Sequence, residues 1–159
     1  MATDAVQNLI GGTFQAAQTD RFDDVFNPST GDVIAHVPLG SAADVDAAVA
    51  SAASALPSWS RTPVIDRARV MFRYRELLEQ QFDETSRLIT RENGKTLAES
   101  RAELRRGIEV VEFACGIPSL FMGRSLADVA ADVDADVMRH PVGVCAGITP
   151  YNFPAMVPM

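Results

Sequence analysis

Apolar side chains recur along this chain with a period of two in some segments and of about 3.6 in others, which separates expected strands from expected helices. Residues 22–26 and 33–37 are short β-prone runs, and the turn-forming residues 27–32 lie between them. They predict two antiparallel strands joined by a loop that is longer than the tightest hairpin turn. Residues 132–137 alternate charged and apolar side chains, as a strand with one face in water does.

Helices are expected between these strands, because the apolar spacing changes and signals for helix starts and stops appear. Ser41 and Asp44 have the spacing of a capping box, and Pro57 stops the pattern that follows. Thr62, with Pro63 in the first turn, begins the next helix. The expected helices run from 41 to 57, from 62 onward, from about 82 to 92, and from 96 to about 116.

Three of these helices carry an apolar face. The fourth and longest begins at a second capping box, Thr96 to Glu99, and Arg105 is expected to pair with Glu109 on its solvent side. The apolar faces comprise Val45, Val49, Ala52 and Leu56 in the first helix, Ile65, Ala68, Phe72 and Leu78 in the second, and Leu104, Ile108, Val111 and Cys115 in the fourth.

The end of the chain has a different character. Residues 142–149 are apolar throughout, and Pro150 follows them at once. A continuous apolar run is typical of a strand that is buried on both faces of a parallel sheet. We therefore predict an α/β fold in which a hairpin and several helices lead into the first strand of such a sheet. Because residues 156–159 are apolar and no polar tail follows, we expect the chain to be a piece of a longer protein.

The composition and charge of the chain disfavour several classes of function. Hydrophobic residues make up 47% of the chain and charged residues 22%, as in ordinary globular proteins. The formal net charge is -7 and no basic cluster is present, which disfavours nucleic acid as a partner. No apolar run is long enough to cross a bilayer, and residues 1–5 lack the pattern of a targeting leader. We expect a cytoplasmic protein with no membrane partner.

Neither the cysteines nor the histidines predict a covalent framework or a metal centre. Cys115 and Cys145 lie far apart in sequence, and His36 and His140 have no further ligands at metal spacing. We expect no metal site. The run GKT at 94–96 mimics the end of a phosphate-binding loop, but isoleucine stands where the first glycine belongs and a helix precedes it.

Asn152 is the main candidate for chemistry. It lies in the proline-rich loop 149–154, directly after the expected strand, at the carboxyl edge where open α/β sheets bind ligands. Its amide group can stabilise an oxyanion if it points at a reacting carbonyl. Loop asparagines more often satisfy the backbone groups of their own loop, and from the residues alone this structural role stays open.

Several motifs resemble the aldehyde dehydrogenase superfamily, and they occur in the family's order. The family's strand followed by Pro-aromatic-Asn-Phe-Pro matches the chain through residue 154, and the longer run 146–158 resembles the CoA-acylating methylmalonate-semialdehyde branch. The upstream matches to this branch are FNPSTG at 26–31, ENGKT at 92–96 and RGIEVVEF at 106–113. The resemblance implies the aldehyde dehydrogenase fold, in an N-terminal fragment that ends before the catalytic cysteine.

The resemblance also implies roles for the loop residues. Asn152 would hold the oxyanion together with the backbone N–H of the downstream cysteine. The NAD contacts would fall at Thr149 and Tyr151, with Pro150 shaping the turn, and Phe153 would line the aldehyde tunnel. The branch more often has phenylalanine where this chain has Tyr151.

An arginine is expected to bind the carboxylate of the substrate, because a guanidinium fork matches a carboxylate. In the semialdehyde branch this arginine lies just before the Gly-Ile-Glu run, which points to Arg106. Gly107 beside it has no side chain to crowd a ligand. Arg105 offers the same chemistry on a different helix face, so both candidates stay open.

The function implied by the resemblance is NAD-dependent oxidation of methylmalonate or malonate semialdehyde, with loss of CO2, to propionyl-CoA or acetyl-CoA. Coenzyme A would be the co-substrate, the full-length enzyme a dimer or tetramer, and the fragment alone inactive. A non-acylating semialdehyde dehydrogenase and an inert assembly fragment are the alternatives. The expected divisions are 1–125 in the NAD-binding domain, 126–141 as an oligomerisation arm, and 142–159 as the first strand and catalytic loop of a Rossmann-like core.

Overall fold

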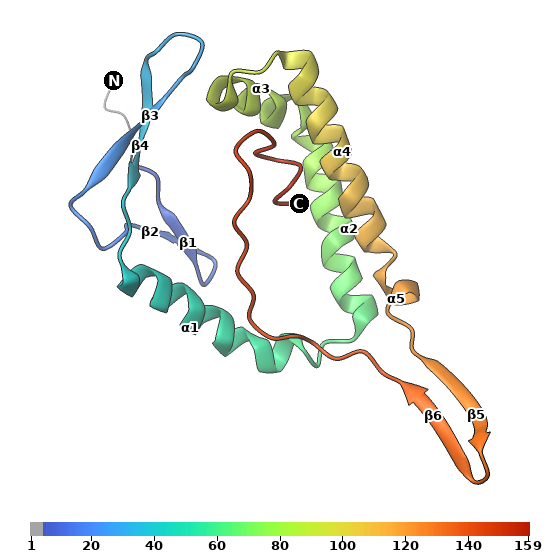
Figure 1. Ribbon diagram of the computed structural model, residues 1–159. Coiled ribbons are helices and arrows are strands. Elements are labelled where there is room, and N and C mark those ends of the chain that lie inside the picture. Colours follow the sequence, from blue (N-terminus) through green and yellow to red (C-terminus); the bar gives the residue numbers. More distant parts are fainter. Residues whose placement is uncertain (1–4) are drawn as a thin grey trace.

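The computed structural model describes residues 5–159; residues 1–4, on which the expectation about a targeting leader partly rests, lie outside the described residues. Along this part of the chain, two two-stranded hairpins are followed by five helices and then by a third hairpin (Figure 1). The elements are β1 (Asn8–Ile10), β2 (Thr13–Gln15), β3 (Phe22–Phe26), β4 (Val33–Pro38), α1 (Ala42–Trp59), α2 (Val64–Gln80), α3 (Phe82–Asn93), α4 (Leu97–Cys115), α5 (Ile117–Leu120), β5 (Arg124–Ala130) and β6 (Val133–Val137).

Two hairpins occupy the N-terminal end of the molecule. β3 and β4 are antiparallel and joined by a long loop, so the sequence prediction for this pair is confirmed. β1 and β2 form a tighter hairpin that the sequence analysis missed. Its turn consists of Gly11 and Gly12, which both have positive φ angles of 61° and 80°. Such a turn favours glycine because side chains are strained in this backbone region.

The core of the described chain lies between α2, α3 and α4. α4 packs against both other helices, and its apolar face, predicted from the spacing of its residues, is confirmed. Leu104, Ile108 and Val111 have no exposed surface, and Cys115 is buried at the same face. Ile89 of α3 completes the cluster with Leu104 and Ile108.

The other predicted apolar faces are covered much less. In α1, Val45 and Val49 remain about half exposed and line an open groove with Val144 of the C-terminal segment. In α2, Ala68 is buried, but more than half of the Phe72 surface is exposed. The periodicity therefore located the helices correctly, but their apolar faces meet too few neighbours within residues 5–159 to be buried.

Two helix boundaries and one ion pair differ from the predictions. α1 continues two residues beyond Pro57, because a proline in the last turn removes only one terminal hydrogen bond. α2 begins at Val64 rather than at Thr62. Arg105 does not form the pair with Glu109 of its own helix that the sequence spacing predicted. Its guanidinium binds both carboxylate oxygens of Glu79 in α2, at 2.5 and 3.1 Å.

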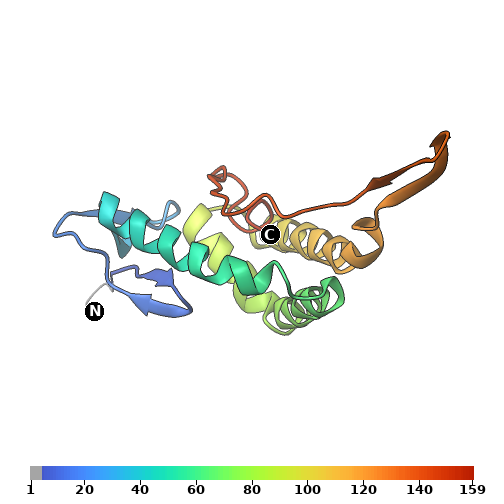
Figure 2. The ribbon, with the colours of Figure 1, turned by 90° about the horizontal axis from the view of Figure 1, so that it is seen from below.

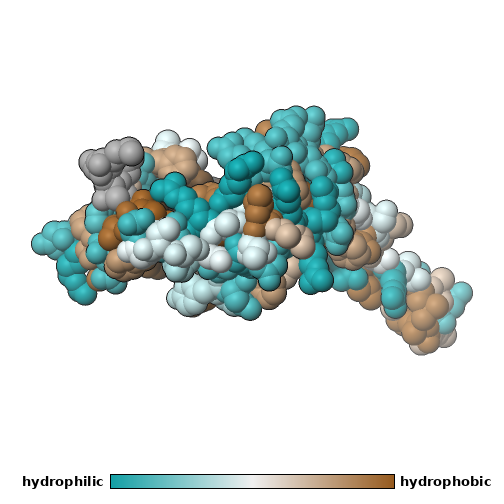
Figure 3. Space-filling model, turned by 90° about the horizontal axis from the view of Figure 1, so that it is seen from above, coloured by the Kyte–Doolittle hydropathy of each residue, from teal (hydrophilic) through white to brown (hydrophobic). Residues whose placement is uncertain are grey.

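After the last helix, the chain forms a long hairpin of the strands β5 and β6. β6 confirms the strand predicted from charge alternation, and the segment before it contains α5 and the partner strand β5, which the sequence analysis did not predict. All residues of both strands are exposed. The β5–β6 hairpin projects from the body (Figures 1 and 2), and apolar side chains gather on its surface at the projecting end (Figure 3). Within residues 5–159, no helix combines the length and apolarity needed to span a bilayer.

The prediction of a buried strand at 142–149 is wrong for this chain. The segment contains no strand, and Val142 and Ile148 are 95% and 101% exposed. A parallel strand forms only when neighbouring strands supply its hydrogen bonds. The strands of the described residues form only two-stranded antiparallel hairpins, so this segment has no parallel sheet to join.

Candidate functional site

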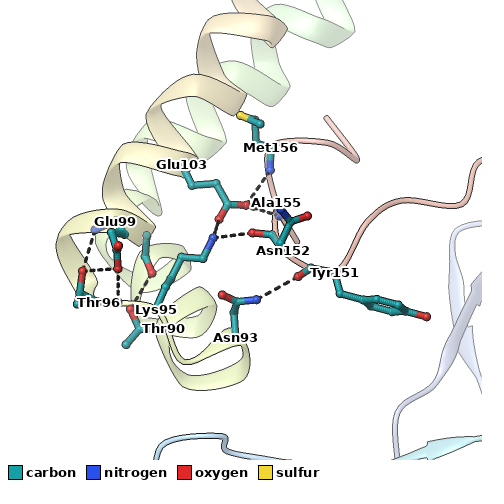
Figure 4. A network of polar contacts seen from close by, with 11 residues as sticks. Thr90, Asn93, Lys95, Thr96, Glu99, Glu103, Tyr151, Asn152, Ala155 and Met156 are labelled. Carbon is teal, nitrogen blue, oxygen red and sulfur yellow. Dashed lines mark hydrogen bonds and ion pairs between the residues drawn. The ribbon is translucent and has the colours of Figure 1, made fainter.

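The candidate site forms where the C-terminal segment returns to the helices and its last residues lie against α4 (Figures 1 and 4). α4 begins there with the predicted capping box, in which the N–H of Glu99 donates to the Thr96 hydroxyl at 3.3 Å. The Thr96 N–H donates in return to the Glu99 carboxylate at 2.9 Å. Hydrogen bonds from the Thr96 hydroxyl and N–H lower the pKa of Glu99 below its usual value. This end of α4 is thereby fixed.

Two side chains, one at the end of α3 and one in the α3–α4 connection, hold the backbone of the loop that contains Asn152. The Asn93 amide donates to the carbonyl oxygen of Tyr151 at 3.0 Å. The Lys95 ammonium donates to the carbonyl oxygen of Asn152 at 2.8 Å, and it also lies 5.0 Å from the centre of the Phe153 ring. The end of α3 and the connection to α4 therefore fix two successive carbonyl groups of the loop.

Glu103 of α4 holds the same loop three and four residues after Asn152. Its carboxylate accepts the N–H of Ala155 at 2.9 Å and the N–H of Met156 at 3.2 Å (Figure 4). Its other oxygen accepts a short hydrogen bond from Lys95. Only 2% of the Glu103 side chain is exposed. Burial alone would raise the pKa of Glu103, but the hydrogen bonds from Lys95 and the two N–H groups outweigh it and hold the pKa below the usual value.

Gly107 allows the segment to approach the backbone of α4. A Cβ atom at this position would lie 2.5 Å from the sulfur of Met159 and 3.3 Å from the Cα of Met156. Space that the sequence analysis left for a ligand is thus filled by the chain itself. Ala155 and Met159 pack on the Ile89, Leu104 and Ile108 cluster, so the loop is also held by apolar contacts.

Three of the predicted site residues come together at one cavity. Arg106, Asn152 and Phe153 line a hollow of about 340 Å³, together with Lys95 and Glu103. The Asn152 carbonyl is bonded to Lys95, whereas its side-chain amide has no hydrogen-bond partner within residues 5–159.

The three predicted cofactor residues lie on the exposed side of the loop. Thr149, Pro150 and Tyr151 are all exposed, and the Tyr151 ring, on a residue that is 93% exposed, points away from α4 (Figure 4). The predicted catalytic and substrate residues thus lie together at the cavity, whereas the predicted cofactor residues lie along the outside of the same loop.

Sequence reasoning missed the roles of Lys95 and Glu103. Lys95 was noted only within the false phosphate-loop signal and the ENGKT motif at 92–96, and Glu103 was assigned no role. One signal was available: Glu103 lies one residue before Leu104 and four before Gly107, on the buried side of α4. A charged residue at a buried helical position needs partners, and here the loop and Lys95 supply them.

A family model for the aldehyde dehydrogenase family matches residues 14–159. The chain belongs to the aldehyde dehydrogenase family. It is 50% identical over 156 residues to the malonate-semialdehyde dehydrogenase 3 of Geobacillus kaustophilus, a match that covers 98% of this chain and 32% of that protein.

Solved structures agree with this membership. The methylmalonate-semialdehyde dehydrogenase of Oceanimonas doudoroffii superposes with a TM-score of 0.94 at 45% identity, covering 98% of this chain and 32% of the other. A structure described as methylmalonate-semialdehyde dehydrogenase from Sinorhizobium meliloti, complexed with NAD, gives a TM-score of 0.94 at 39% identity over 99% of this chain and 32% of the other. The chain therefore spans about a third of the length of these relatives, and its fold is that of the corresponding part of the family.

Proposed function

We propose that this chain supplies the oxyanion loop and the substrate-carboxylate site of an NAD-dependent, CoA-acylating malonate- or methylmalonate-semialdehyde dehydrogenase. The observation that carries this proposal is the cavity shared by Asn152, Arg106 and Phe153. It combines an amide donor, a cation and an aromatic wall. These are the groups that an aldehyde with a carboxylate at its other end would need. The names of the similar enzymes agree with this substrate class.

Asn152 is assigned to the developing oxyanion. Its backbone carbonyl is bonded to Lys95, and its side-chain amide is free to donate within the described chain. An N–H donor that is held in place before the reaction stabilises the negative charge on the former carbonyl oxygen without reorganising. The nucleophile would be a cysteine from the part of the enzyme that the chain does not span.

Arg106 is the better candidate for the substrate carboxylate. Arg105 is occupied by its bidentate pair with Glu79, on the side of α4 that faces α2. Arg106 lines the cavity with Asn152 instead. A guanidinium can bind a carboxylate through two parallel hydrogen bonds, which would orient the semialdehyde relative to Asn152.

The loop also fits part of a cofactor contact. NAD, when bound, accepts the hydride from the aldehyde carbon. Thr149 and Tyr151 would provide the contacts, with Pro150 shaping the turn, because all three are exposed and the Tyr151 ring points away from α4 (Figure 4). The phenolic hydroxyl of Tyr151 would add one polar group to an otherwise aromatic contact.

The acyl group is proposed to leave on coenzyme A rather than on water. Malonate semialdehyde, coenzyme A and NAD would give acetyl-CoA, CO2 and NADH, and the methylated substrate would give propionyl-CoA. The run 146–158, with its resemblance to the acylating branch, supports this assignment.

The exposed β5–β6 hairpin is assigned to contacts between subunits of a homo-oligomer.

The test uses a chimaera in which this chain replaces its matching segment in the malonate-semialdehyde dehydrogenase 3 of Geobacillus kaustophilus. With malonate semialdehyde and NAD, the chimaera is expected to form NADH and, in the presence of coenzyme A, acetyl-CoA. The 159-residue chain alone is expected to form no NADH. A free acid in place of the thioester would favour the non-acylating alternative, and NADH from the chain alone would overturn the assignment of an incomplete site.

Arg106→Leu in the chimaera is expected to raise KM for malonate semialdehyde by about tenfold or more, the scale of losing one charge-assisted carboxylate contact. Uncharged aldehydes should be affected much less, because they have no carboxylate to bind. Steady-state kinetics with both substrate classes measures the difference. Arg105→Leu is the matched control, since its guanidinium is paired with Glu79. Equal losses on charged and uncharged aldehydes for Arg106→Leu would contradict the carboxylate role.

A further inference from the structure

The loop around Asn152 is held through its backbone on both sides of that residue. Before and at Asn152, the carbonyl groups of Tyr151 and Asn152 accept hydrogen bonds from Asn93 and Lys95. After it, the N–H groups of residues 155 and 156 donate to Glu103. With the backbone fixed in this way, the direction of the Asn152 side chain depends only on its own torsion angles.

Lys95 and Glu103 are bonded to each other as well as to the loop. The ammonium contacts the Glu103 carboxylate and the Asn152 carbonyl (Figure 4). It also lies over the Phe153 ring. The side chains are only 15% and 2% exposed. Buried ion pairs contribute little net stability, because the loss of hydration offsets their attraction. Removal of either partner leaves the other charge buried without compensation, so the pair is well suited to enforcing one arrangement of the loop.

We propose that Lys95 and Glu103 are a positioning pair for Asn152. Neither is assigned to the substrate. Lys95 sets the peptide group at Asn152, Glu103 sets the two N–H groups that follow, and the contact between them links both to α4. The catalytic consequence of this arrangement rests on the proposed function, whereas the fixing of the loop does not depend on it.

The loop itself can be tested on the 159-residue chain, without any activity. Hydrogen exchange of the Ala155 and Met156 amides, followed by NMR, is expected to be slow in the unaltered chain. In Glu103→Ala the same amides should exchange about tenfold faster or more, since each loses a hydrogen bond to a charged acceptor. Arg101→Met, which removes an exposed ion pair of α4 with Asp83, is the control and should leave both rates unchanged.

Lys95 provides a second measurement, because it is the only lysine of the chain. Its acetylation rate can be compared with that of the N-terminal amine of the same molecules by peptide mass spectrometry. In Glu103→Gln, which keeps the side-chain shape, Lys95 is expected to react about tenfold faster relative to that internal reference. Unchanged acetylation in Glu103→Gln, together with unchanged amide exchange in Glu103→Ala, would overturn the proposal.

Kinetics of the chimaera then test the catalytic consequence. Lys95→Met is expected to lower kcat about 10- to 100-fold with KM nearly constant, because a small misplacement of a catalytic group mainly affects the transition state. Lys95→Arg should restore part of kcat, since it keeps the charge and the donors. A higher KM for acidic substrates with unchanged kcat would show that Lys95 binds the substrate itself, and would overturn the positioning role.

The two proposals fail in different ways. An unaltered chimaera that forms no NADH would defeat the proposed function, while the exchange and acetylation rates would still decide whether Lys95 and Glu103 fix the loop. An active chimaera whose kcat is the same in Lys95→Met and Arg101→Met would overturn the positioning pair and leave the proposed function intact.

Discussion

Asn152→Ala in the chimaera is expected to lower kcat by about two to three orders of magnitude, the scale of losing one oxyanion donor. The substitution affects only the side chain of this residue. Only the backbone carbonyl of Asn152 takes part in attaching the loop, so truncation of the side chain removes the amide donor and leaves the attachment to Lys95 in place. Pre-steady-state and steady-state NADH formation would measure the loss at the chemical step.

The same variant carries its own structural control. Amide exchange at Ala155 and Met156 should match that of the unaltered chain, because Glu103 still accepts both N–H groups. Asn152→Asp, which keeps the size but not the donor, should lose as much activity as Asn152→Ala. Gln80→Ala removes an exposed amide from α2 and should have little effect. A nearly normal rate in Asn152→Ala would return this residue to a purely structural role.

Leu104→Ala is expected to lower the free energy of unfolding of the chain by about 2 to 5 kcal/mol, the range for truncating a fully buried leucine. Leu104 has no exposed surface and lies at the centre of the cluster on which Ala155 and Met159 pack. The cavity would therefore loosen the loop as well as the helices. Urea unfolding followed by circular dichroism measures the free energy, and exchange at Ala155 reports the loop.

Val110→Ala is the matched control for this substitution. Val110 belongs to the same helix but is about half exposed, so its truncation should cost well under 1 kcal/mol. If both variants unfolded at the same urea concentration, α4 would not be the centre of the fold in solution.

Local patterns predicted those parts of the fold that depend on neighbours close in sequence. The β3–β4 pair followed from two apolar runs around a turn-rich segment, and the buried face of α4 followed from the spacing of Leu104, Ile108 and Val111. The β1–β2 hairpin was also within reach, because Gly11 and Gly12 between the short β-prone runs 9–10 and 13–14 are a typical two-residue turn. That signal was overlooked rather than absent.

Predictions that needed distant partners failed. The run 142–149 has the composition of an inner strand, but composition cannot supply the adjacent strands that would bond its backbone. The pairing of Arg105 was assigned to its own helix because sequence spacing shows only local neighbours. The structure pairs it with Glu79, 26 residues away, because α2 packs against α4.

The residues of the candidate site also fall into those that local motifs predicted and those that depend on contacts between distant parts of the chain. Asn152 and Arg106 were identified from motifs, and the structure brings them to one cavity. Lys95 and Glu103 gain their meaning only when the C-terminal loop folds back over α4, across more than fifty residues of sequence. No local pattern encodes that return, so the residues that hold the site were harder to find than those assigned to its chemistry.

The close approach at Gly107 limits how such a chain can evolve or be engineered. Any larger residue there must displace the Met159 side chain and press against the backbone at Met156. A graded series from alanine to valine would therefore act as a wedge of increasing size between α4 and the loop that carries Asn152. Selection for activity should keep this position as glycine even in lineages whose substrates have changed, because the constraint comes from the Met159 side chain and the Met156 backbone of the protein itself and not from the ligand.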